Sequence, residues 1–206
     1  TLKVMPIPSK LPESSVSESC DSSEEASISE TSEFSSELSS EETKDFSNEE
    51  ARAYLQKVLE KEKDFTYKCL VWGEVTTENF QKFIYNLEHT ALLSFLPNWY
   101  AYVDFDSDGI DELLITNLAG GQCLVLRYDG EKAIGYIIEY LSGVKTDGTL
   151  LIGMDNEKGS CSISKISFDG LDYEITDLAY KDASENLYQL DQKPASKDEV
   201  ENYFDN

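Results

Sequence analysis

The hydrophobic and polar positions change their period along the chain. Between residues 51 and 59, apolar residues recur at spacings of three and four, as on one face of a helix. Ser47 and Glu50 form an S-x-x-E capping box in front of this row. A second helical row begins near Thr77 and runs to Leu96, where Pro97 ends it. Residues 67–75 between the two rows are apolar and fit neither period clearly.

Beyond Pro97 the period becomes two, which is typical of strands. The strands we predict are 99–105, 112–118, 122–128, 133–140, 149–154, 161–168 and 171–179, with a short one around Tyr188. Glycine-containing dipeptides separate most of them and supply the positive φ that hairpin turns need. Because these turns recur with no helix between them, the pattern favours an antiparallel meander.

This order of elements predicts an α+β fold class. We expect N-terminal helices packed on an antiparallel β-meander of about seven strands, and a short C-terminal helix that begins after Ser196. Residues 46–206 would form this single domain, with the hairpin around residues 104–112 inside it.

Residues 1–45 differ in composition from the rest of the chain. They are rich in serine and glutamate and contain only isolated apolar residues. Such a segment cannot bury enough apolar surface to offset its conformational entropy, so we expect a disordered acidic tether. An acidic solubilising tail is the alternative interpretation.

Charge and cysteine content limit the classes of partner. The chain of 206 residues has a formal net charge of −24, which argues against nucleic acid and anionic membrane surfaces as partners. No apolar run is long enough to span a membrane. The four cysteines have no metal-type spacing, so free thiols are expected, with a Cys123–Cys161 cross-strand disulfide as the alternative.

The candidate chemistry lies between two predicted strands, in the sequence YVDFDSDGIDELLI. Counting Asp104 as position 1, carboxylates stand at positions 1, 3, 5 and 9, which are Asp104, Asp106, Asp108 and Glu112. Gly109 at position 6 permits a sharp turn. Four like charges this close repel one another strongly unless a cation lies among them.

The expected ligands of that cation are hard oxygens. The backbone carbonyl of Ile110, at position 7, would add a fifth ligand to the four carboxylates. Ca²⁺ takes six to eight oxygen ligands in a flexible shell, whereas Mg²⁺ needs a small and nearly octahedral one. The pattern therefore favours one Ca²⁺ in the 104–112 loop.

The D-x-D-x-D-G-x-x-E pattern between two strands resembles the calcium loops of FG-GAP repeats in integrin-type β-propellers. An EF-hand differs, because its closing glutamate stands at position 12, which here is Ile115. Over residues 47–206 the chain also resembles secreted or lipid-anchored proteins of Gram-positive gut bacteria that carry one such loop. This resemblance implies an extracellular location at the cell surface, calcium binding, and an export signal and lipid anchor that would precede Thr1.

Two functions fit the sequence. The first is a non-enzymatic, surface-tethered module with one structural Ca²⁺ that binds or scaffolds an unidentified protein or glycan; Tyr100 and Tyr102 are candidates for exposed contacts. The alternative is a carboxylate-dependent hydrolase that acts on cell-wall or dietary carbohydrate. No nucleophile elbow, zinc motif or phosphate loop is present, so we predict no catalytic residues, and the first function is favoured.

Overall fold

The computed structural model describes residues 4–7, 46–69, 73–89, 97, 99–116, 121–155 and 159–205. Its helices are α1 (Asn48–Leu59), α2 (Phe80–His89) and α3 (Lys197–Asp205). Its strands are β1 (Met5–Pro6), β2 (Asp64–Lys68), β3 (Val75–Asn79), β4 (Trp99–Val103), β5 (Glu112–Thr116), β6 (Gly121–Tyr128), β7 (Ala133–Val144), β8 (Leu150–Asp155), β9 (Ser160–Asp169), β10 (Asp172–Asp182), β11 (Leu187–Leu190) and β12 (Lys193–Pro194). None of the described helices combines the length and the apolar character that crossing a bilayer requires.

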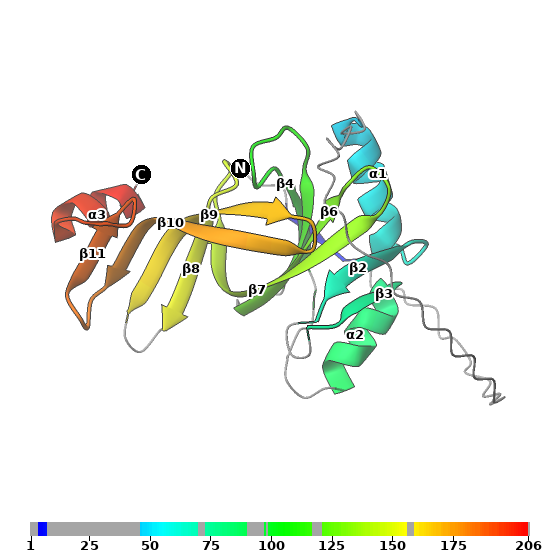
Figure 1. The fold of residues 1–206 in the computed structure, drawn as a ribbon, viewed down its shortest axis with the longest axis horizontal. Helices are drawn as coiled ribbons and strands as arrows, with labels where there is room; N and C mark the ends of the chain where they lie inside the picture. The colour runs from blue at the N-terminus through cyan, green and yellow to red at the C-terminus, as the bar shows by residue number, and fades with distance from the viewer. Residues whose placement is uncertain are drawn as a thin grey trace, which may run out of the picture. The chain divides into compact units, whose positions relative to one another are not determined.

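All the described strands belong to one mainly antiparallel sheet (Figure 1). Its main path is β1-β4-β5-β6-β7-β8-β9-β10-β11-β12. The long strand β7 pairs with β6 on one edge. Its other edge is shared, because β2 pairs in parallel with its first residues and β8 pairs with its last ones. The β2–β3 hairpin is thereby joined to the middle of the sheet.

The predicted fold class is wrong. The described residues form a mostly antiparallel β-sheet of 12 strands with three short helices, and helices do not make up one layer of an α+β domain. Each of the seven strand ranges predicted from the two-residue period overlaps one observed strand, β4 to β10. The missed strands are the two-residue β1 and β12, which are too short to show a period, and the β2–β3 hairpin, which lies between the two predicted helices.

The predicted second helix was partly wrong for a local reason. Residues 75–79 are strand β3, and α2 begins only at Phe80. The run Val75-Thr76-Thr77 is β-branched and favours a strand. Asn79 then starts the helix, because its side-chain oxygen accepts a hydrogen bond from the backbone N–H of Lys82 at 3.0 Å. The predicted continuation to Leu96 lies mostly outside the described residues.

The predicted start of α1 is confirmed. The Ser47 side chain accepts a hydrogen bond from the backbone N–H of Glu50, and the Glu50 carboxylate accepts one from the backbone N–H of Ser47. The buried face of the helix carries Ala51, Leu55, Val58 and Leu59. A short helix needs such a buried face, because propensity alone does not stabilise it.

Both faces of the central strands are buried. One face of β5 and β6 packs with α1, α2 and β2 around Phe65 and Phe83. The opposite face packs with residues of β8 and β9, such as Ile152 and Ile166. Strands β8 and β9 therefore cover a face of the same sheet to which they belong. Tyr102, expected to be exposed, instead lies half-buried beneath α1, where its hydroxyl contacts the Gln56 side chain at 3.2 Å.

Most of the predicted tether, residues 8–45, lies outside the described residues, and its disorder stays a prediction. Residues 4–7 are described. Met5 and Pro6 form β1 and pair with Tyr100 and Trp99 of β4, and Ile7 packs against the core beneath α1. Residues 4–7 thus belong to the same compact unit as the described residues from Phe46 onward.

The three cysteines within the described ranges are free thiols, and Cys20 lies outside them. A cross-strand pair of Cys123 and Cys161 is not formed, because β7 and β8 lie between their strands, β6 and β9. Cys123 is buried, which raises the pKa of its thiol to about 12.

We expect Cys123 to resist alkylation in the native protein at pH 8, because a buried thiol with a raised pKa offers almost no thiolate. Iodoacetamide labelling followed by peptide mass spectrometry would measure this, with the partly exposed Cys161 as the internal reference. Equal labelling rates for the two cysteines without denaturant would show that this face of the sheet opens.

Candidate metal centre

The acidic loop joins two adjacent strands of the sheet. Strands β4 and β5 are antiparallel neighbours, and Val103 pairs with Glu112. This register closes the loop over residues 104–111 and places Glu112 at its base. Phe105, the second residue of the loop, is buried in the core and fixes the loop to the sheet.

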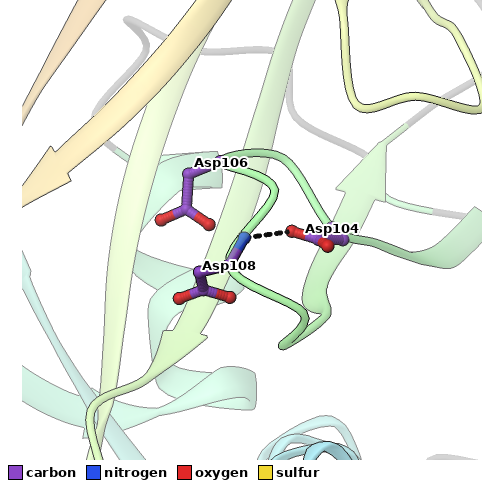
Figure 2. Close-up of side chains that lie close together, drawn as sticks. All are labelled: Asp104, Asp106 and Asp108. Carbon is purple, nitrogen blue, oxygen red and sulfur yellow. Dashed lines mark hydrogen bonds between the residues drawn. The ribbon is translucent and has the colours of Figure 1, made fainter.

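The structure brings three of the predicted ligands together. Asp104, Asp106 and Asp108 each offer a carboxylate oxygen, and these oxygens lie within 4.8 Å of one another (Figure 2). This group could hold a metal ion. The turn at its centre is the predicted one, since Gly109 has a φ of 87°.

Backbone N–H groups order the loop from within. The Asp104 carboxylate accepts hydrogen bonds from the N–H groups of Asp108 and Gly109, both at 3.1 Å. Figure 2 shows the first of these bonds. The N–H of Ile110 donates to the Asp108 carboxylate at 2.7 Å. These bonds hold the Asp104 and Asp108 carboxylates in place although their charges repel.

Glu112 is buried without full compensation of its charge. Its side chain has no exposed surface, and it does not belong to the group of three aspartates. One oxygen, Oε2, accepts a hydrogen bond from the N–H of Phe105 at 3.0 Å. The other, Oε1, has no hydrogen-bond donor in the described part of the chain. Burial raises the pKa of Glu112 to about 8, against the opposing effect of the Phe105 hydrogen bond.

Arg127 is the residue that sequence analysis missed. It extends from β6, and its Nη2 lies 3.0 Å from Oδ2 of Asp108 and 3.5 Å from Oδ2 of Asp106. Its Nε lies 3.5 Å from Oε1 of Glu112, the oxygen without a hydrogen bond. One guanidinium thus faces three of the expected ligands. The only available signal was that Arg127 is one of just two arginines in a very acidic chain.

A further contact fixes the loop to the first helix. Asp111 accepts hydrogen bonds from the Asn48 side chain at 2.5 Å and from Nε of Arg52 at 2.7 Å. Its own N–H donates to Asn48 at 2.9 Å. Arg52 and Arg127 are the only arginines in the sequence, and both contact this loop.

The turn between β7 and β8 lies against the back of the loop. Gly148, in this turn, has a φ of 81° and is buried. A Cβ placed on it would lie 2.3 Å from the carbonyl oxygen of Asp104 and 2.9 Å from the Cα of Phe105. The loop backbone and this glycine are therefore in direct contact, with no room for a side chain.

Two parts of the sequence-based site prediction are not tested by this geometry. No contact describes the Ile110 carbonyl as a ligand, so its role stays a prediction. The hydrolase alternative also stays a prediction; Glu112, with its raised pKa, is fully buried and out of reach of a bulky substrate. No protein-family model, curated protein or solved structure matches the chain.

Proposed function

We propose that the chain is a non-enzymatic, surface-displayed module whose 104–112 loop binds one structural Ca²⁺. One observation carries this proposal: three aspartates lie with their oxygens within 4.8 Å, beside the buried Glu112, whose Oε1 has no hydrogen-bond donor among the described residues. An isolated carboxylate in such a place is costly, and a divalent cation would offset that cost.

The chemistry of the donors favours Ca²⁺ among the divalent cations. All five expected ligands are oxygens, four of them on carboxylates, and no nitrogen or sulfur ligand is among them. Hard cations prefer such oxygens, whereas zinc sites use histidine or cysteine. The irregular spacing of a loop suits the larger and more adaptable shell of Ca²⁺ better than that of Mg²⁺.

A structural role follows from what the loop contacts. It joins β4 to β5, is bonded to α1 through Asp111, and is backed by the turn at Gly148. A cation that tightens the loop would stabilise all three contacts at once. The FG-GAP-like pattern supports an extracellular surface location, where calcium is abundant. A protein or glycan is the proposed partner of the module.

A thermal melt of the full chain in EDTA, in millimolar Ca²⁺ and in equal Mg²⁺ tests the calcium site. Sites of this kind on extracellular modules bind Ca²⁺ with dissociation constants of about 10⁻⁴–10⁻³ M. At tenfold excess over that value, the native state gains about 1.4 kcal/mol, or roughly 3–6 °C in melting temperature. We expect this shift with Ca²⁺ and a much smaller one with Mg²⁺.

The matched variants for this test are Asp106→Ala and Asp169→Ala. Asp106 belongs to the aspartate group, whereas Asp169 is exposed at the end of β9. Only Asp106→Ala should lose the calcium-dependent shift. Equal melting temperatures of the unaltered protein in EDTA and in Ca²⁺ would contradict the calcium proposal.

A further inference from the structure

We propose that Arg127 competes with the cation for the carboxylates of the loop. Its guanidinium lies where the cation would bind, and this competition sets how tightly the loop binds Ca²⁺. This inference rests on the calcium proposal and adds a residue that determines the affinity. Its basis is that the Arg127 guanidinium contacts Asp106, Asp108 and Glu112, three of the five expected ligands, at 3.0–3.5 Å.

Shared oxygen atoms are the first step of the argument. Arg127 faces Oδ2 of both aspartates and Oε1 of Glu112, the buried oxygen without a hydrogen bond. A bound Ca²⁺ would need carboxylate oxygens at 2.3–2.6 Å. Oxygens held this close to a divalent ion cannot keep a guanidinium at the same point, so the two cations exclude each other from it.

Electrostatic repulsion is the second step. A guanidinium that remained about 5 Å from a divalent ion would weaken its binding on the order of tenfold even with the screening of bulk water, and more in a partly buried site. Because the Arg127 side chain is 28% exposed, it can turn outward, but it then gives up its ion pairs. Either course lowers the affinity for Ca²⁺.

A role for Arg127 without the cation is the third step. In the metal-free protein it is the positive charge that offsets the crowded carboxylates. The face of Phe168, whose centroid lies 5.5 Å from the guanidinium carbon, helps to hold it there. The fold therefore tolerates the loop without metal. Binding of the cation then stabilises the protein less than it would if no positive charge already faced the carboxylates.

Calcium titration calorimetry on the full chain tests the proposal with Arg127→Gln and the matched control Arg52→Gln. Both variants remove one positive charge next to the loop, but Arg52 contacts Asp111, which is not an expected ligand. We expect Arg127→Gln to lower the dissociation constant on the order of tenfold and Arg52→Gln to change it less than about threefold. In EDTA, Arg127→Gln should also melt at a lower temperature than the unaltered protein.

Each outcome is decisive. If the unaltered protein binds Ca²⁺ and Arg127→Gln binds it equally or more weakly, the proposed competition is wrong, but the calcium site is still supported. Binding by Arg127→Gln alone would support it, and binding by neither would reject the calcium site itself and the competition with it. Should Arg127→Gln not fold in EDTA, Arg127→Met keeps the apolar stem beside Phe168 and gives the same comparison.

Discussion

Replacing Gly148 with alanine is expected to destabilise the protein strongly and to disturb the acidic loop, which is far from Gly148 in the sequence but in contact with it. An alanine at positive φ costs about 1–2 kcal/mol. Its Cβ would also collide with the carbonyl oxygen of Asp104 and the Cα of Phe105, both backbone atoms that no rotamer change can move. Overpacking of this kind costs about 1–3 kcal/mol more. Chemical and thermal unfolding would measure the total.

Gly170→Ala is the matched control for this experiment. Gly170 also has a positive φ, 57°, but a Cβ there would meet nothing within 4 Å. The difference between the two variants isolates the collision, and we expect Gly148→Ala to melt lower than Gly170→Ala by roughly 3–10 °C. Because the collision moves Asp104, Gly148→Ala should also lose most of its calcium response. Equal destabilisation by the two variants would show that the turn and the loop are not in contact.

Glu112→Gln is expected to have opposite effects with and without calcium. Glutamine has the same shape and keeps an oxygen for the Phe105 N–H, but it removes the buried negative charge. Without metal, the variant should therefore be the more stable protein above pH 8, by a few kcal/mol. Added calcium should not stabilise the variant, because the ion has lost a charged ligand.

The pH dependence gives this prediction its sign. The pKa of Glu112 lies at about 8 in the folded protein and near 4.5 in the unfolded chain. Between these values the folded state holds the proton more tightly, so the stability from this group is fully present below about pH 4.5. It falls as the pH rises to about 8 and then stays constant. Urea unfolding in EDTA at several pH values should show this decline in the unaltered protein and its absence in Glu112→Gln.

Glu78→Gln provides the comparison for a buried carboxylate away from the loop. Glu78 is also buried, but its oxygens accept hydrogen bonds from Tyr67 at 2.8 Å and Asn86 at 2.9 Å. This variant should keep the calcium response. If Glu112→Gln kept it as well, Glu112 would be excluded as a ligand and the site would be reduced to the three aspartates.

Local signals explain which features could be predicted from the sequence. The start of α1 depends on Ser47 and Glu50, three residues apart, and the turn of the acidic loop depends on Gly109 within the aspartate pattern. Strand β4 follows from alternation of its residues, and β5 from a short apolar run, since its first four residues are all buried. Such features are encoded by neighbours in the chain, so pattern and spacing are sufficient to find them.

The features that were missed depend on residues far apart in the chain. Arg127 meets the loop only because β6 lies beside β5, and Gly148 meets it only because the turn after β7 packs behind it. No periodicity contains this information. The exposure of Tyr102 was misjudged for the same reason, since α1 covers the face that alternation alone would assign to solvent.

The position of β1 gives the domain a weak point under mechanical force. Ile7 packs on the core, and Phe46 packs edge-on against Tyr128 with ring centroids 5.0 Å apart, so both of these residues are fixed to the same domain. A pulling force applied to the described N-terminal residues would reach the two-residue pairing of β1 with β4 first. Because this pairing spans only two residues, we expect it to separate before α1 and the acidic loop bear the force.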